Sequence, residues 1–413
     1  MAETAAFLVD HVLPRVPVRQ WVLSLPIELR YRLAYDSRLT ARVLRIFMQT
    51  VFGSLRRRAR KRWGRKRYLC GSVTFVQRFG DALNLNVHFH SVVLDGVYVV
   101  EANGGPRFRR LPAPSDAEVE RVTRSIVRRL RRLLLRCGLG PETEASDADP
   151  LESSDPLLAE IYAASVRSRS AMAERSGRKL LRIGQRLDAE EAAFCPSPRC
   201  ASVDGVSLHA NVAVPAHDRR RLETLFRYVA RPPVSTQRLS RLDDGKLLYR
   251  LKKRWRDGTT HVVFEPIELL EKLVAIVPPP RCHLVRYHGA LAPRARCRRA
   301  VVSSANAHAT QDLRRPDSRI TAACTTRRHA AAPNPKPERT RRRWIPWAEL
   351  MRRVFAIDVL QCPRCKGSMR VLELMLPPDA TRALLDAMCL PARAPPLGPA
   401  RYDAGALEAP APD

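Results

Sequence analysis

The segment His88-Phe89-His90 places two imidazoles two residues apart in a stretch rich in β-forming residues. Alternate side chains of a strand point to the same face, so His88 and His90 would project together. Two neutral imidazoles and one hard oxygen ligand would leave room for substrate oxygens around Mg²⁺ or Mn²⁺. Such a metal can polarise a phosphodiester for attack. The spacing alone also fits two structural histidines, which is the commoner role of a bare His-x-His pair.

Two residues could supply the oxygen ligand. Gln77 lies on the strand expected before the histidine pair, and strand pairing could bring its carbonyl oxygen beside His88. A polar residue on a sheet face explains Gln77 equally well. Asp95 offers a harder carboxylate, but it falls in the turn expected after the histidine strand, where its side chain can serve the turn. Gln77 is therefore the first choice and Asp95 the second.

The sequence around these residues predicts an α+β fold with an antiparallel sheet flanked by helices. Asp95-Gly96 between two β-rich runs indicates a hairpin, and Asp218 is a plausible N-cap of a helix that must end before Pro232-Pro233. We expect strands at 18–25, 68–79, 87–94, 97–100, 205–215, 246–251 and 260–264, and helices at 28–62, 115–136, 157–174, 218–231, 266–277 and 344–357.

The charge predicts a polyanionic partner. The 73 Lys and Arg residues outnumber the 41 Asp and Glu residues, which leaves a formal net charge of +32. The planar guanidinium group of arginine is well suited to bind phosphate. A GC-rich genome can also encode arginine at any surface position that tolerates a basic side chain, without a role in binding. One dense basic run surrounds Trp63, on which a base could stack, and it favours DNA contact. Its residues include Arg56, Arg57, Arg58, Arg60, Lys61 and Arg62.

The cysteines indicate a reducing, cytoplasmic setting and one candidate zinc site. Ten cysteines are scattered without a disulfide framework, and no stretch approaches the length of a membrane span. Cys362 and Cys365 form a Cys-x-x-Cys motif, which could supply two of the four ligands of a structural Zn²⁺ site. The other two ligands stay open, with Cys324, His329 and Cys389 as candidates.

Four separated segments resemble one known family, the rolling-circle (HUH) transposases of the IS-ninety-one type and their common-region relatives. They are GSVTFVQRFGDALNLNVHFHSVVLDGVYV at 71–99, RYVARPPVSTQRL at 227–239, DGTTHVVFEPIELLEKLVA at 257–275 and HLVRYHGALAPRA at 283–295. The resemblance covers about residues 15–300, with a weaker echo at 344–370.

The resemblance implies roles for single residues. In that family the histidine pair binds the metal, which carries over to His88 and His90, and a tyrosine in RY-x-x-RPP attacks DNA, which carries over to Tyr228. A phenol is a poor nucleophile, so the metal and the cations Arg227 and Arg231 would have to assist it. Typical members carry a second tyrosine four residues earlier, where this chain has Thr224, so the chain resembles the single-tyrosine branch.

Three other tyrosine interpretations stand beside this one. Tyr228 could simply pack at a helix end on Pro232, and Tyr287 is a rival nucleophile. Tyr249 lies inside an expected strand, where packing is the natural role.

The resemblance also implies an organisation and a reaction. We expect a metal-binding half of an HUH nuclease core at 1–137, a catalytic-tyrosine region at 138–297, a basic linker at 298–343, a C-terminal segment at 344–390 and a disordered tail at 391–413. The family's N-terminal zinc segment would precede Met1. The implied reaction nicks and rejoins single-stranded DNA at transposon ends through a 5′-phosphotyrosine, without ATP and with a host helicase as a candidate partner. The rivals are an inactive DNA-binding remnant and a replication initiator or relaxase with the same chemistry.

Overall fold

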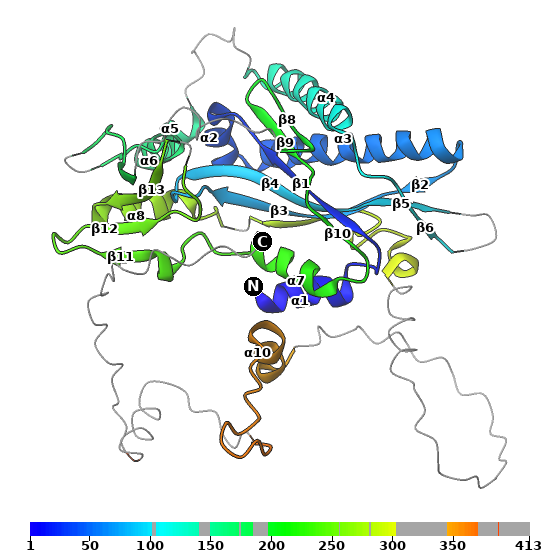
Figure 1. Ribbon diagram of the computed structural model, residues 1–413. Coiled ribbons are helices and arrows are strands. Elements are labelled where there is room, and N and C mark those ends of the chain that lie inside the picture. Colours follow the sequence, from blue (N-terminus) through cyan, green and yellow to red (C-terminus); the bar gives the residue numbers. More distant parts are fainter. Residues whose placement is uncertain are drawn as a thin grey trace. The chain divides into compact units, whose positions relative to one another are not determined.

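The computed structural model describes two compact units, residues 1–326 and 327–413, and each is considered by itself. The residues described are 1–100, 105–139, 149–172, 175–184, 197–255, 257–280, 282–302, 345–370 and 387. The first unit combines antiparallel sheets with helices, which confirms the α+β fold class (Figure 1).

A seven-stranded antiparallel sheet forms the centre of the first unit. Its strand order is β14-β3-β4-β1-β9-β8, with β10 also paired to β1. The sheet therefore takes strands from both sides of residue 138, since β14 pairs with β3 and β9 pairs with β1. The strands are β1 (Val18–Ser24), β3 (Gly71–Phe79), β4 (Leu85–Leu94), β8 (Cys200–Val203), β9 (Val206–His209), β10 (Ala213–Val214) and β14 (Val285–Gly289).

Helices cover both faces of this sheet because its strands alternate apolar residues to either side (Figure 1). Phe89 and Val93 face a core built with α2 (Ile27–Tyr35), α3 (Ser37–Trp63), α4 (Asp116–Leu135) and α6 (Pro156–Val166). Val73, Phe75 and Val92 face a second core built with α1 (Ala2–His11) and α7 (Arg219–Val229).

Two smaller sheets complete the first unit. One is three-stranded and contains β2 (Tyr68–Leu69), β5 (Gly96–Val99) and β6 (Arg107–Arg110). The other has the order β11-β12-β13-β7 and contains β7 (Leu181–Gly184), β11 (Leu239–Arg241), β12 (Leu247–Arg250) and β13 (Thr259–Phe264). Three further helical segments of this unit are α5 (Pro150–Ser154), the 3₁₀ turn η1 (Thr236–Arg238) and α8 (Pro266–Ile276).

Several local expectations are confirmed. Asp218 caps α7 by accepting a hydrogen bond from the Arg221 N–H at 2.8 Å. Ser115 caps α4 at the start of the helix expected at 115–136. The strands expected at 246–251 and 260–264 form as β12 and β13, which pair with each other. These features depend on a few adjacent residues, so the sequence alone specifies them.

Three local expectations are wrong. The helix expected at 28–62 is two helices, because Asp36 ends α2 and its side chain caps α3 through the Leu39 N–H. The strand expected at 205–215 is split into β9 and β10, which pair with different parts of β1. Asp95-Gly96 does not turn β4 back on β5, because β5 pairs with β2 and β6 instead. Gly96 is needed for close packing, since a side chain there would collide with the Arg109 carbonyl.

The second unit is described over residues 345–370. An amphipathic helix, α10 (Trp347–Phe355), lies inside the helix expected at 344–357, and a turn around Cys362 follows it. Most of the linker at 298–343, the tail at 391–413, and Cys324, His329 and Cys389 lie outside the described residues. No helix within the described ranges has the length and apolar character needed to cross a membrane.

Candidate active site around His88, His90 and Tyr228

The two histidines lie side by side on the sheet face covered by α7. His90 is opposite Phe75 on β3 and Val22 on β1, while His88 is opposite Gln77 and Ser24. Their ring centroids are 4.9 Å apart. Strand alternation therefore produces the expected pair of imidazoles facing one way.

Hydrogen bonds orient both rings. His88 Nδ1 is 2.8 Å from the Asn86 carbonyl oxygen, so Nδ1 carries the proton and the Nε2 lone pair is available for a metal. His90 Nδ1 is 2.8 Å from Gln20 Nε2, which can donate to it and would place the ring proton on Nε2. Exchanging the oxygen and nitrogen of the Gln20 amide would instead present Oε1 to the ring, and His90 would then donate from Nδ1 and leave Nε2 available for a metal. Gln20, on the neighbouring strand, is a positioning residue that the sequence did not reveal.

Burial keeps both imidazoles neutral. Desolvation by burial, with smaller contributions from His88 and Arg231, lowers the pKa of His90 to about 3. Desolvation also lowers the pKa of His88. A neutral imidazole is the form that binds a metal, so the environment suits the role implied by the resemblance.

The site also contains an unpaired oxygen. Asn86 Oδ1 is buried and has no hydrogen-bond partner among the described residues. A buried amide oxygen without a partner is costly, and a hard cation would satisfy it. Asn86 lies two residues before His88 on the same strand, so alternation could have identified it. Its oxygen and the two imidazoles are donors of the types that divalent cations take as ligands.

Gln77, the predicted third ligand, has a second task. Its Nε2 donates to the Val229 carbonyl oxygen at 2.6 Å, which ties the end of α7 to β3. Its Oε1 has no hydrogen-bond partner among the described residues and remains a candidate ligand beside Asn86.

Asp95, the second choice for the third ligand, is bound elsewhere. Arg19 donates to both of its carboxylate oxygens, at 3.0 and 2.9 Å, and also to the Ala210 carbonyl at 2.9 Å. Both side chains of the ion pair are only 5% exposed. Asp95 therefore neither binds the metal nor serves a hairpin turn, and instead fastens the end of β4 to β1.

We expect Asp95→Ala to lower the free energy of unfolding by about 3–5 kcal/mol, because the Arg19 charge would stay buried without its partner. Urea denaturation measures this loss. Glu120→Ala is the matched control, since Glu120 pairs with Arg124 on the surface and its loss should cost less than about 1 kcal/mol. Equal losses for the two variants would contradict a structural role for the buried pair.

Tyr228 lies in the last turn of α7 and reaches the histidines. Its ring centroid is 6.4 Å from that of His90, with the rings nearly perpendicular at 82°. The side chain is 39% exposed, so the phenol is open to a large substrate. The structure thus brings Tyr228 beside His90 of the histidine pair, although the two lie far apart in the sequence.

Two cations flank the Tyr228 ring. The Arg231 guanidinium lies 4.5 Å and Lys252 Nζ 4.1 Å from the ring centroid. Cations at this distance are attracted to the face of the ring, so Arg231 and Lys252 help to hold Tyr228 in place. Arg231 was predicted, whereas Lys252 was missed because it follows a distant strand and has no local signal. Arg227 points elsewhere, since its Nη2 donates to Thr224 Oγ1 at 3.1 Å.

The rival tyrosines lie in other places. Tyr249 is fully buried and accepts a hydrogen bond from Arg238 at 2.8 Å, which supports a packing role. Tyr287 is on β14 opposite Val73, on the far side of Phe75 from the histidines. It packs in the core beneath α1 and α7, so Tyr228 is the better placed nucleophile.

The basic run is not part of this site. Arg56, Arg58, Arg60, Lys61 and Arg62 belong to α3, which covers the opposite face of the sheet (Figure 1). Arg56 donates to the Tyr68 carbonyl at 3.3 Å and Arg58 donates to the Pro112 carbonyl, so both also serve the fold.

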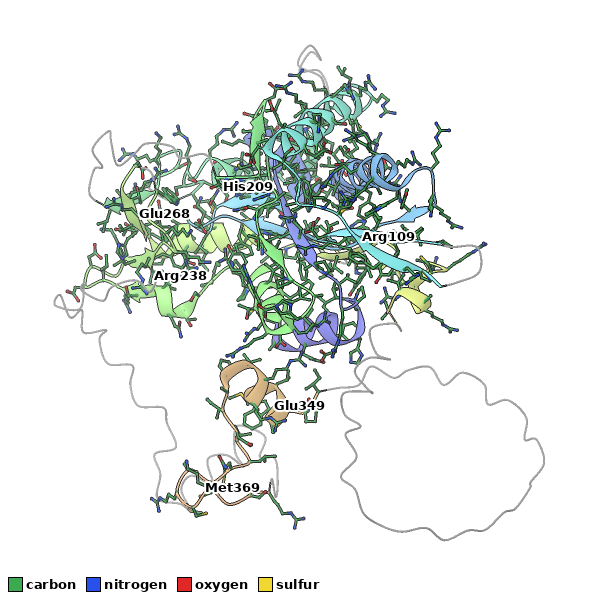
Figure 2. All side chains as sticks on the ribbon, turned by 45° about the vertical axis from the view of Figure 1, so that its right-hand side comes forward. Arg109, His209, Arg238, Glu268, Glu349 and Met369 are labelled. Carbon is green, nitrogen blue, oxygen red and sulfur yellow. The ribbon has the colours of Figure 1, made fainter. Side chains whose placement is uncertain are left out.

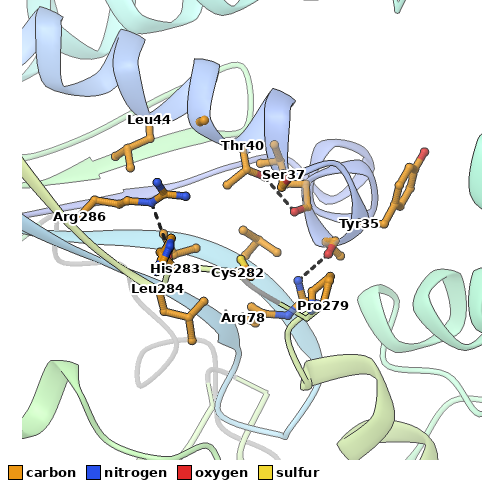
Figure 3. Close-up of a pocket in the computed structure, with 15 residues that line it drawn as sticks. Tyr35, Ser37, Thr40, Leu44, Arg78, Pro279, Cys282, His283, Leu284 and Arg286 are labelled. Atoms are coloured by element: carbon orange, nitrogen blue, oxygen red, sulfur yellow. Dashed lines mark hydrogen bonds between the residues drawn. The ribbon is translucent and has the colours of Figure 1, made fainter.

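A cavity beneath α2 and α3 is too small for a substrate (Figure 3). It is lined by Arg78, His283 and Arg286 among others, and its volume is about 30 Å³. That volume suits one or two water molecules rather than a nucleotide. Arg78 is fixed beside it by carbonyl oxygens of Ala34 and Ala275.

The Cys362–Cys365 turn has the local geometry of a metal knuckle. Hydrogen bonds from the backbone N–H groups of Cys365 and Arg364 lower the pKa of the Cys362 thiol. Such N–H groups favour the thiolate that binds zinc. Within the described ranges no three His, Cys, Asp or Glu residues are grouped to hold a metal.

Comparisons with known proteins agree with a DNA-processing role. The family described as putative transposase matches residues 71–300, a range that contains the histidine pair, Tyr228 and Lys252. Neither the curated proteins nor the solved structures yield a match.

Proposed function

Because the chain belongs to this putative transposase family, we propose that it is a metal-dependent HUH tyrosine transposase that nicks and rejoins single-stranded DNA in rolling-circle transposition. The observation that carries the proposal is the contact of Tyr228 with the neutral His90 of the histidine pair, 6.4 Å between ring centroids. A nucleophile beside two imidazoles and an unpaired buried oxygen is the arrangement that phosphodiester exchange requires.

The divalent ion belongs with His88, His90 and an amide oxygen from Asn86 or Gln77. When bound, Mg²⁺ or Mn²⁺ would polarise the scissile phosphate. The chain itself holds the two imidazoles neutral by burial, and it keeps their orientation through Asn86 and Gln20.

Tyr228 carries the covalent step. Its phenol loses a proton to solvent, Oη forms a bond to the scissile phosphorus, and the bond from phosphorus to the 3′ oxygen breaks. The 3′ oxygen takes up a proton and leaves as a hydroxyl, while the 5′ phosphate stays on Tyr228. One phosphodiester replaces another, so the reverse attack by a 3′-OH rejoins DNA without a nucleotide cofactor.

Arg231 and Lys252 hold the Tyr228 ring in place and supply positive charge beside the phosphate that it attacks. Arg231 is itself held near Asp81, with 3.9 Å between Nη2 and Oδ1, and its guanidinium also lies over the Phe79 ring. The position of Arg231 is therefore set by the β3 side of the site, whereas Lys252 approaches from the segment after β12.

The proposal is tested by incubating the full chain with a labelled single-stranded oligonucleotide from the transposon ends and Mn²⁺. We expect a protein–DNA adduct that survives denaturation, and peptide mapping should locate it on Tyr228. An inactive DNA-binding remnant would bind the oligonucleotide without forming the adduct. A replication initiator or relaxase would form it on a plasmid origin in preference to transposon ends.

Lys252→Gln should slow adduct formation about tenfold, because it removes about 1.4 kcal/mol of stabilisation of the negatively charged transition state by the cation. Initial rates on the same oligonucleotide measure the effect. Lys253→Gln removes an exposed charge from the adjacent position and should leave the rate within about twofold. Equal slowing by the two variants would mean that the net charge matters and the contact of Lys252 with Tyr228 does not.

A further inference from the structure

An arginine-lined groove lies between α3 and α4, on the face of the sheet opposite to Tyr228. Its volume is about 390 Å³. Gly53 opens it, because a Cβ added there would meet nothing within 4 Å. The lining residues are Gln49, Thr50, Gly53, Arg57, Arg121, Val122, Ser125, Arg128 and Arg129.

The groove has an excess of positive charge. Arg57 and Arg121 share one carboxylate, that of the buried Glu118, and their side chains remain 63% and 67% exposed. Arg129 is held at the wall by Thr50 Oγ1 at 2.9 Å and by Gln49. Arg128 is exposed and makes no hydrogen bond or ion pair with any residue that the structure describes. Four guanidinium groups against one carboxylate leave three positive charges for a phosphate backbone to neutralise.

The charge continues along α3. The helix contains no acidic residue, and Arg38, Arg45 and Arg60 are exposed along it. Figure 2 shows side chains that end in nitrogen projecting from this helix. From Arg38 to Arg60 the helix axis extends about 33 Å at 1.5 Å per residue. One turn of B-DNA is about 34–36 Å, so this row of charges matches the length of one duplex turn.

The composition of the groove favours duplex over single-stranded DNA. Surfaces that bind single strands combine basic residues with aromatic rings on which bases stack. None of the lining residues of the groove is aromatic. Without an aromatic side chain on which bases could stack, the guanidinium groups can bind only the phosphate backbone. A stiff duplex presents its phosphates in a regular array.

We propose that the α3–α4 groove binds the phosphate backbone of duplex DNA flanking the strand that Tyr228 cuts. This inference rests on the proposed function for its choice of DNA as the partner. The catalytic face would then hold the single strand while the opposite face holds the adjoining double helix.

The test measures binding of the full chain to a fluorescent blunt duplex of about 20 base pairs by anisotropy over a range of salt concentrations. Arg121→Gln/Arg128→Gln should weaken binding at least tenfold and reduce the slope of log K against log salt by about 2, since each lost phosphate contact removes about 0.9. Gly53→Leu fills the groove without changing any charge and should weaken binding several-fold. Arg167→Gln/Arg178→Gln removes two exposed arginines from elsewhere in the unit and is the matched control.

Equal weakening by the groove and control pairs would overturn the proposal, as would unchanged binding by Gly53→Leu. A loss confined to a single-stranded 20-mer would overturn the choice of duplex. The groove variants should keep the rate of adduct formation on a short single strand. Failure of the proposed function would instead appear as a missing Tyr228 adduct in the unmodified chain, whatever the duplex affinity.

Discussion

Tyr228→Phe is expected to abolish the denaturation-resistant DNA adduct. The substitution removes the only atom that forms the bond to phosphorus, and loss of a nucleophile typically costs at least about 10³-fold in rate. The aromatic ring stays, so its contacts with His90, Arg231 and Lys252 are kept. Because the side chain is 39% exposed, the loss of one hydroxyl should hardly change stability.

Gel analysis of the labelled oligonucleotide after denaturation measures the adduct, and anisotropy measures binding in the same samples. The variant should bind the oligonucleotide with nearly unchanged affinity. Tyr287→Phe is the matched control, because it removes the hydroxyl of a tyrosine on β14, the edge strand beside β3. This variant should form the adduct at the normal rate. If the adduct persisted in Tyr228→Phe but disappeared in Tyr287→Phe, Tyr287 would be the nucleophile.

His88→Ala/His90→Ala should weaken Mn²⁺ binding at least 100-fold and remove metal-dependent cleavage. Two of the protein ligands are lost together, and even residues that only orient ligands contribute about 10–100-fold to metal affinity. Electron paramagnetic resonance of free Mn²⁺ gives the affinity without reference to activity. Thermal unfolding checks that the variant remains folded, because His90 is buried.

His209→Ala provides the control for removing an imidazole. His209 lies on β9 opposite Val22, on the same face of the sheet, but its Nε2 is 3.3 Å from Cys200 Sγ rather than at the histidine pair. Its loss should leave Mn²⁺ affinity unchanged. If the double variant kept its Mn²⁺ affinity, the metal would have to bind elsewhere. The assignment of His88 and His90 as metal ligands would then be wrong.

Measuring Mn²⁺ affinity also shows whether Asn86 or Gln77 supplies the oxygen ligand. Asn86 Oδ1 has no hydrogen-bond partner among the described residues, while Gln77 already holds Val229 through its Nε2. Asn86→Ala should therefore reduce Mn²⁺ affinity with little effect on the position of α7. Gln77→Ala should loosen α7 as well, which would lower the cleavage rate even at saturating Mn²⁺.

The sequence by itself determined the features that depend on neighbouring residues. Strand alternation placed His88 and His90 on one face, and Asp218 and Pro232 fixed the limits of the helix that carries Tyr228. The same alternation would have included Asn86. These assignments were predictable because hydrogen-bond geometry and the two-residue period of a strand act over a few residues.

Only the tertiary structure decided which distant residues meet. The register of β1 against β4 places Gln20 at His90, and the ion pair with Arg19 removes Asp95 from the site. Packing brings Lys252 to Tyr228 and puts the arginines of α3 on the other face of the sheet. Such long-range contacts depend on strand register and on which faces are buried together. Neither can be predicted from the spacing of adjacent residues.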